Sequence, residues 1–198
     1  MRRAAWLAGG ALLLACAGGP APRDHFYRLE TSAPTPLAAP IFRGTVEVDR
    51  FRADALTGGI RIVLRQADGA SELEPYDYHQ WADPPTTQLQ TCLVDYLRQA
   101  QAAPLVVIPE LRARADFAVL GRIARLEHQT GGGAPRAVVE LELTVSRESD
   151  RTLLLQRVYR EERPAAGPGV AEAVAAADEA LSAIFAQFLT DAGAQIPR

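Results

Sequence analysis

The clearest pattern along the chain is an alternation of apolar and polar positions within segment 136–148. This period of two is typical of an antiparallel strand with one face on the core and one face in solvent. Segments 115–128 and 152–162 predict long strands on either side of it, joined to it by a glycine-rich loop and by a turn at Asp150. The expected inward face of the middle strand is formed by Val139, Leu141, Leu143 and Val145.

Two other segments repeat their apolar residues at spacings of three and four, which is the period of a helix with one buried face. The first helix is expected to begin at Asp83-Pro84, where the aspartate can cap and the proline is tolerated. The second extends from about Pro168 to Ala192, and its apolar stripe favours a helix that lies on the sheet. The stripes are formed by Leu89, Cys92, Leu93, Tyr96, Leu97 and Ala100, and by Val170, Val174, Ala177, Leu181, Ile184 and Phe188.

Four shorter segments have the composition of strands. Segments 46–51 and 60–65 flank a Leu-Thr-Gly-Gly turn and are expected to pair with each other. Segment 72–78 contains Pro75, which confines it to a sheet edge or a bend. Segment 104–109 predicts a short apolar strand. Together these elements indicate a strand-rich domain with two helices.

The first residues have the pattern of an export signal. Arginines at positions 2 and 3 precede an apolar run from Ala4 to Ala15, too short for an ordinary transmembrane helix of roughly 20 residues. The run ends in Leu-Leu-Ala before Cys16, which resembles the bacterial lipobox, in which the cysteine is lipidated and becomes the mature N-terminus. The alternative is a chance cysteine after a plain signal peptide. We expect residues 1–15 to be a lipoprotein signal peptide and Cys16 to carry lipid.

The residue after the cysteine bears on which membrane holds the protein. In enteric bacteria, an aspartate directly after the lipidated cysteine retains a lipoprotein in the inner membrane. This chain has Ala17 at that position, so the enteric sorting rule favours the periplasmic face of the outer membrane. Residues 16–40 are rich in Pro, Ala and Gly and are expected to form a tether with a short strand at 26–30. Residues 41–198 are expected to form a single domain.

Charge and composition exclude several classes of protein. The formal net charge is −3, and loss of the two leader arginines makes the mature chain more acidic, so nucleic acid is not an expected partner. All 21 basic residues are arginines, which excludes a lysine-dependent phosphate loop or Schiff base. With Cys16 lipidated, an intrachain disulfide is excluded, and the place of Cys92 on an apolar helix face favours a buried thiol.

The sequence contains no motif for catalysis, a metal or a cofactor. His25, His79 and His128 lie far apart and lack the spacing of metal ligands, and no serine lies in a G-x-S-x-G elbow. Glu140 and Glu142 share a strand face that is expected to be solvated, although spacing alone does not rule out a glycosidase-like pair. The sequence therefore favours a binding or scaffolding protein over an enzyme.

Segment 74–87 reads EPYDYHQWADPPTT and gathers aromatic residues where a strand meets the first helix. Tyr78 and Trp81 are expected first of all to pack in the core with their polar tips at its rim. A contact with a partner is the second interpretation, in which Tyr78, His79 and Trp81 form the binding site, because exposed aromatic residues anchor interfaces. A catalytic role for His79 is the least favoured of the three.

The order of these motifs resembles that of a known family. The lipobox is followed by FYRL at 26–29, by a Val-x-Val strand at 46–48, by IRIVLR at 60–65 and by YHQWADP at 78–84 before a helix. This order is similar to that of ABC-type transport auxiliary lipoproteins, the third components of paraquat-inducible (Pqi-type) systems built around mammalian-cell-entry (MCE) proteins. The connection at 56–59 departs from the family, in which a charged or proline-bearing connection is more common.

The resemblance implies an α/β domain similar to the N-terminal, anticodon-binding-like domain of TolB. Such a domain has a mixed sheet flanked by helices, here with long antiparallel strands in the C-terminal half. The resemblance also implies a non-enzymatic, lipid-anchored subunit without a cofactor, which docks on a periplasmic MCE protein and its membrane permease. The implied role is to move phospholipid or other hydrophobic molecules between the two membranes, with a homo-oligomer as the possible assembly.

Two other classes of protein stay open at this point. The first is an outer-membrane assembly or cell-wall-associated structural lipoprotein, whose partner would be a β-barrel complex or peptidoglycan. The second is a lipid-anchored periplasmic hydrolase, which would require His79, a serine and a carboxylate to converge in the fold.

Overall fold

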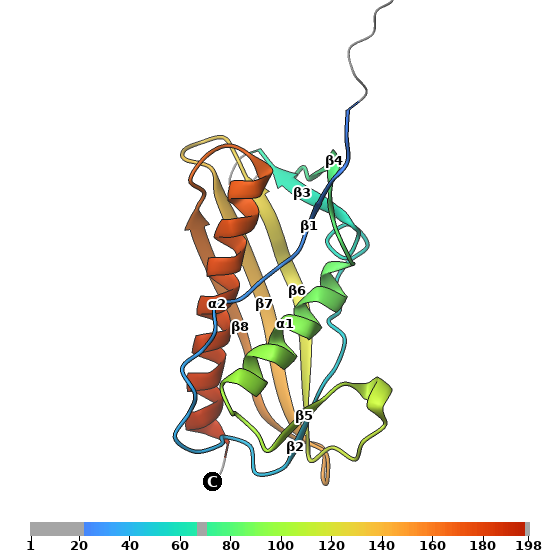
Figure 1. The fold of residues 1–198 in the computed structure, drawn as a ribbon, viewed down its shortest axis with the longest axis vertical. Helices are drawn as coiled ribbons and strands as arrows, with labels where there is room; N and C mark the ends of the chain where they lie inside the picture. The colour runs from blue at the N-terminus through green and yellow to red at the C-terminus, as the bar shows by residue number, and fades with distance from the viewer. Residues whose placement is uncertain (1–21, 67–70, 197–198) are drawn as a thin grey trace, which may run out of the picture.

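The computed structural model describes residues 22–66 and 71–196 of the chain. The expected signal peptide and Cys16 lie outside the described residues. Within the described residues, a mixed eight-stranded sheet is covered on one face by two helices (Figure 1). The expected α/β class is therefore confirmed, with the long strands in the C-terminal half.

The sheet is built around β6 (Phe117–Gln129), which pairs along its whole length with β7 (Arg136–Arg147). β7 pairs in turn with β8 (Thr152–Pro164), and all of these pairings are antiparallel, as the alternation predicted. The other edge of β6 pairs in parallel with two short strands, β2 (Thr45–Val48) near its start and β3 (Arg61–Arg65) near its end.

Three further strands complete the sheet. β4 (Glu74–Trp81) is antiparallel to β3, and β5 (Leu105–Val107) lies parallel to β2. β1 (His25–Tyr27) lies parallel to β4 at the end of the strand order. The first element of the described chain therefore joins the sheet as an edge strand.

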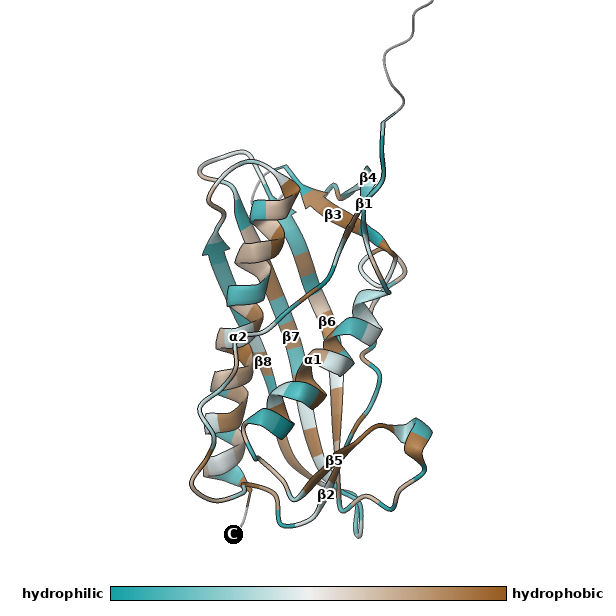
Figure 2. Cartoon of the chain, viewed as in Figure 1, coloured by the Kyte–Doolittle hydropathy of each residue, from teal (hydrophilic) through white to brown (hydrophobic). Residues whose placement is uncertain are grey.

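The two helices, α1 (Pro85–Gln99) and α2 (Val170–Gln195), lie on the same face of the sheet (Figure 1). A short 3-10 turn, η1 (Pro109–Leu111), follows β5. The sheet strands alternate hydrophobic and hydrophilic residues along their length (Figure 2). α2 is long and apolar enough to cross a bilayer, but its apolar side is buried against the sheet. The largest fully buried side chains include Leu141, Leu143, Leu181, Ile184, Phe185 and Phe188.

The start of α1 differs from the expectation in its cap. Asp83 was expected to cap the helix, but Pro84 occupies the N-cap and no side chain makes a cap hydrogen bond there. The physical reason is the second proline: Pro85 stands at the first helical position and has no N–H that needs a partner.

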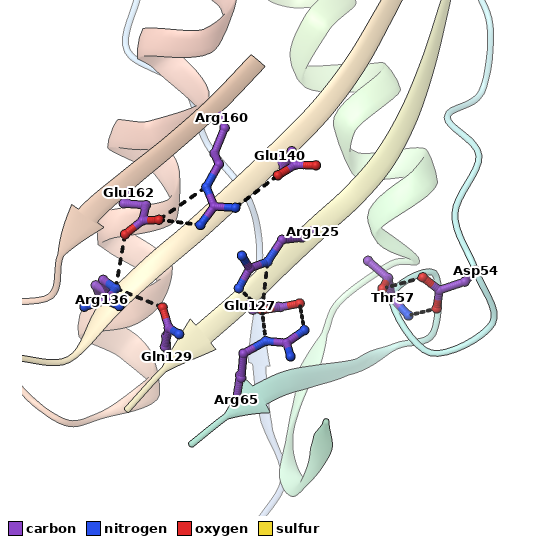
Figure 3. Close-up of polar contacts among 10 residues, drawn as sticks. All are labelled: Asp54, Thr57, Arg65, Arg125, Glu127, Gln129, Arg136, Glu140, Arg160 and Glu162. Carbon is purple, nitrogen blue, oxygen red and sulfur yellow. Dashed lines mark hydrogen bonds and ion pairs between the residues drawn. The ribbon is translucent and has the colours of Figure 1, made fainter. Parts of the chain in front are cut away.

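The expected pairing of segments 46–51 and 60–65 is wrong, because β2 and β3 do not pair within the described chain. Both lie along one edge of β6 at its opposite ends, so the connection runs along that edge instead of folding back. Asp54 builds the turn: its carboxylate accepts hydrogen bonds from the Thr57 N–H and the Thr57 hydroxyl (Figure 3). It also accepts one from the Leu56 N–H. Such a side-chain-closed turn replaces the expected hairpin.

Residues 28–43, called the strap below, run from β1 across the helices to β2 (Figure 1). The buried Leu29 donates its N–H to Gln88 Oε1 on α1 at 2.7 Å, and its carbonyl accepts from Cys92 Sγ at 3.3 Å. These contacts turn the Leu29 backbone toward α1. The first strand consequently ends at Tyr27, not at residue 30 as the expected strand 26–30 required.

Candidate functional site

The residues singled out in segment 74–87 lie on β4, at the edge where β1 joins the sheet. Parallel pairing places His25 beside His79 and Tyr27 beside Trp81. The ladder between β3 and β4 shifts register along this stretch, which makes β4 irregular there. The expected partner-binding residues therefore lie on an irregular strand next to the N-terminal edge strand.

Tyr78 and Trp81 have opposite environments although they are three residues apart. Trp81 is 4% exposed and belongs to the hydrophobic core, where it lines a small hollow together with Ile62 and Leu126. Tyr78 is 45% exposed. Of the candidate binding residues, Trp81 thus packs the fold from within, and Tyr78 presents its ring to solvent.

All three histidines of the chain lie in one cluster at this edge, although they are far apart in the sequence. His79 stacks on His25 with ring centroids 5.0 Å apart, and its Nδ1 lies 2.8 Å from the Tyr27 hydroxyl. Tyr76 lies 5.5 Å from His79 between ring centroids, and its hydroxyl is 2.9 Å from His128 Nδ1. We call these five residues the histidine–tyrosine cluster; it joins β1, β4 and β6.

Two imidazoles of the cluster, those of His79 and His128, have a lowered pKa. Burial, and secondly the neighbouring His25, lowers the pKa of His79. Burial also lowers the pKa of His128, against a smaller opposing effect of Glu172. His128 Nε2 is buried without a hydrogen-bond partner among the described residues. At neutral pH, His79 and His128 therefore act as stacking and hydrogen-bonding groups for Tyr27 and Tyr76, not as cations.

The geometry gives no support to the hydrolase hypothesis. Within the part of the chain that the structure describes, His79 contacts the rings of His25, Tyr27 and Tyr76, which supply neither a serine nor a carboxylate. The described residues also contain no group of three or more His, Cys, Asp or Glu placed to hold a metal ion. The cluster can pack and hydrogen-bond, but it lacks the parts of a hydrolytic triad.

The face of the sheet opposite the helices carries a ladder of ion pairs (Figure 3). Glu140 pairs with Arg160 at 3.4 Å, and Glu142 pairs with Arg122 at 2.9 Å while accepting a hydrogen bond from Gln156 at 2.7 Å. The hydrogen bonds from Gln156 and Arg122 lower the pKa of Glu142. A general acid requires a raised pKa, so Glu142 does not have the electrostatics of the acid in a glycosidase pair.

Glu127 is the buried member of this ladder, with its side chain 4% exposed. Arg65 on β3 and Arg125 on β6 approach it at 2.7 and 2.8 Å (Figure 3). Burial raises the pKa of Glu127, but the hydrogen bonds from both arginines outweigh burial and lower it overall. The carboxylate is therefore ionised and links the two strands where they meet.

Cys92 is buried on α1, which confirms the expected buried thiol. Burial, followed by the carboxylates of Asp178, Asp95 and Glu30, raises the pKa of Cys92 to about 12. A thiol with so high a pKa stays protonated and is a poor nucleophile. The residue therefore contributes packing and one weak hydrogen bond to Leu29.

Sequence reasoning placed His79 in the site but missed Tyr27 and Tyr76. The available signal was weak: His25 and Tyr27 on one segment, and His79 and Trp81 on another, share the period-two spacing of strands. What brings them together is the parallel pairing of β1 with β4, two segments about fifty residues apart. Nothing in either segment alone indicates that partner.

Comparisons with known proteins agree on the architecture. The family model described as "ABC-type transport auxiliary lipoprotein component" matches residues 27–188, and no curated protein matches the chain. Protein XCC0632 from Xanthomonas campestris has a similar crystal structure, with a TM-score of 0.75 and 23% identity over 86% of this chain and 96% of that one. The crystal structure of an uncharacterized protein has a TM-score of 0.64 and 16% identity, over 89% and 100% of the two chains. At these identities the two structures show the fold alone.

Proposed function

Because the chain belongs to the family of ABC-type transport auxiliary lipoprotein components, we propose that it is the non-enzymatic accessory subunit of an MCE-type transport system. Its partners in this role are a periplasmic MCE protein and the membrane permease. The system moves phospholipid or other hydrophobic molecules between the inner and outer membranes. The observation that carries the proposal is the family match, which spans residues 27–188 and thus most of the sheet and both helices.

The proposed anchor is lipid on Cys16, at the periplasmic face of the outer membrane. Several acyl chains on one cysteine give a stable attachment, whereas a single chain binds only marginally. Eight residues (17–24) separate Cys16 from the first residue of β1, and the nine Cα-to-Cα steps between them span at most about 30 Å. In this arrangement the edge formed by β1 and β4 stays close to the membrane.

We place the partner contact at Tyr78. His79 and Trp81 support β4 through their contacts with β1 and with the core. Tyr78 is 45% exposed and Phe26 on the adjacent β1 is 65% exposed. Large exposed aromatic side chains are the residues that most often anchor protein interfaces. A homo-oligomer is part of the proposal as well, because β8 pairs only with β7 in the described sheet and leaves its other edge available.

The proposal is tested by deleting the gene for this protein, the gene for the MCE partner, or both in the native bacterium. We expect the same change in phospholipid composition of separated inner and outer membranes in all three strains, because the two proteins act in one system. Mass spectrometry of the two membrane fractions measures the change. A plasmid with the natural gene should restore the composition, and the Cys16→Ser version should not. Additive defects in the double deletion would contradict a shared role.

A further inference from the structure

An apolar groove is lined by the last part of the strap and the C-terminal end of α2. These two segments lie at the end of the molecule remote from the β1–β4 edge (Figure 1). The volume of the groove is about 1100 Å³. One wall is the last part of the strap, segment 37–43, and the other is the C-terminal end of α2. Its apolar lining includes Leu37, Ile41, Pro104, Leu189 and Ile196.

The groove has a fixed shape because the strap is held in place. The Leu37 N–H donates to the Ala100 carbonyl at 2.9 Å, and the Ile41 and Phe42 N–H groups donate to the Ala102 carbonyl at 2.9 and 3.0 Å. Phe42 is fully buried and serves as the anchor of this segment. The wall is therefore built into the fold, as is usual for small-molecule sites.

Gly193 lines the groove on the α2 side and has no side chain that could project into it. A Cβ at this position would lie 3.7 Å from Ile41 Cδ1, which is ordinary contact distance. Alanine is therefore tolerated here, whereas a leucine would extend across the groove between the two walls. This position offers a way to fill the groove from an exposed residue of the helix.

Arg43 is the one charged side chain among the described residues that line the groove. Arg43 also lines an adjoining hollow of about 300 Å³, which contains Arg114, Arg147 and the carboxylates of Asp116 and Glu148. Asp116 in that hollow is engaged by the Thr45 N–H at 2.8 Å, and Arg147 is paired with Asp150. Within residues 22–66 and 71–196, the guanidinium groups of Arg43 and Arg114 have no carboxylate partner. The groove lining itself contains no carboxylate.

We propose that this groove binds an acyl chain of an anionic phospholipid, with the phosphate held by Arg43 and Arg114. The inference rests on the proposed transport function and deepens it, because it places the transported lipid on this chain. Apart from Arg43, the lining offers Thr190 as its one polar side chain. An acyl chain has no polar groups to satisfy against this mainly apolar lining. Guanidinium forks suit the phosphate.

The test is direct binding to the full chain carrying Cys16→Ser, with dioctanoyl phosphatidylglycerol below its micelle concentration as the probe. Isothermal titration calorimetry measures the affinity for this phospholipid, and native mass spectrometry measures how many molecules bind to one chain. Gly193→Leu fills the groove, and Gly193→Ala is its matched control. Arg43→Glu with Arg114→Glu reverses both proposed phosphate contacts, and Arg28→Glu is a single charge reversal at an exposed position near the start of α1. Thermal unfolding confirms that each variant is folded.

We expect one bound phospholipid, with affinity at least about tenfold weaker in Gly193→Leu and in the arginine double variant, a loss of about 1.4 kcal/mol or more. Gly193→Ala and Arg28→Glu should bind as the unsubstituted chain does. Dioctanoylglycerol, which lacks the phosphate, should bind weakly, and inorganic phosphate alone should not bind measurably. No phospholipid binding, or equal binding by the groove-filling variant, would overturn the proposal. Because no transporter component is present, this outcome is separate from the result of the gene deletions.

Discussion

Trp81 is the residue through which the N-terminal edge of the sheet is tied to the core. It ends β4, pairs in register with Tyr27, and shares a hollow with Leu126 of β6 and Val174 of α2. The exposed Tyr78 on the same strand makes no comparable contribution to the core. The two aromatic residues of the motif should therefore respond differently to truncation.

Trp81→Ala should lower the free energy of unfolding by about 3–5 kcal/mol, because it removes a large buried side chain and leaves a cavity. Tyr78→Ala should change it by no more than about 0.5 kcal/mol, because the ring is largely solvated. Urea unfolding of the Cys16→Ser chain, followed by circular dichroism, measures both. Equal losses for the two variants would contradict the division between a packing residue and a surface residue.

Asp178 and Ser182 on α2 both accept hydrogen bonds from the strap, and the contact with Asp178 carries an electrostatic cost. Asp178 Oδ1 accepts the Glu30 N–H at 2.9 Å. Burial raises the pKa of Asp178 from 3.8 to about 6, the Glu30 N–H opposes this shift, and the Glu30 charge adds to it. The Asp178 carboxyl therefore binds its proton more tightly in the folded state than in the unfolded state. Its protonation stabilises the folded state at low pH, and this stabilisation is lost as the pH rises through about 6.

Asp178→Asn should make the protein more stable at pH 7 by about 1 kcal/mol, after allowance for solvent around this partly exposed carboxyl. The gain should vanish near pH 4, where Asp178 is protonated in the unsubstituted chain, because asparagine keeps the acceptor for Glu30. Urea unfolding at several pH values between 4 and 7.5 measures the difference. A difference that stays constant with pH would show that Asp178 does not titrate as the structure implies.

At the scale of strands, Gly121 sets how closely β6 can approach the segment after β2. A Cβ at this position would overlap the ring of Phe51, which is 2% exposed and cannot move away cheaply. Gly121→Ala should therefore destabilise the fold by about 1–3 kcal/mol, the usual cost of overpacking. Gly133→Ala, in the loop after β6 where no atom lies within 4 Å, is the matched control and should have little effect. Thermal unfolding compares them, and a neutral Gly121→Ala would refute the close approach.

The elements that were predicted correctly have patterns contained within one segment. The alternation in β7 and the three- and four-residue spacings of α1 and α2 depend only on neighbours along the chain. Pairings across the sheet are not encoded in this way. The prediction of a hairpin was wrong because Asp54 closes a turn after which β3 pairs with the far end of β6. The histidine–tyrosine cluster depends on the parallel pairing of β1 with β4.

At the scale of the whole molecule, the strap connects two ends with different chemistry (Figures 1 and 2). One end holds the N-terminal edge strand and the exposed Tyr78 and Phe26. The other holds the apolar groove with Arg43 in its lining. In the proposed arrangement, with lipid on Cys16, the end that carries Tyr78 and Phe26 lies near the membrane and makes the proposed partner contact, and the groove lies at the end remote from the anchor.

The central claim is that this lipoprotein works as a subunit of an MCE-type transporter, and co-purification tests it most directly. The tagged protein is recovered from detergent-solubilised membranes of the native bacterium and its partners are identified by mass spectrometry, with the Cys16→Ser chain as the control. We predict strong enrichment of an MCE protein together with its permease over that control. Recovery of barrel-assembly components instead, or of nothing above the control, would contradict the claim.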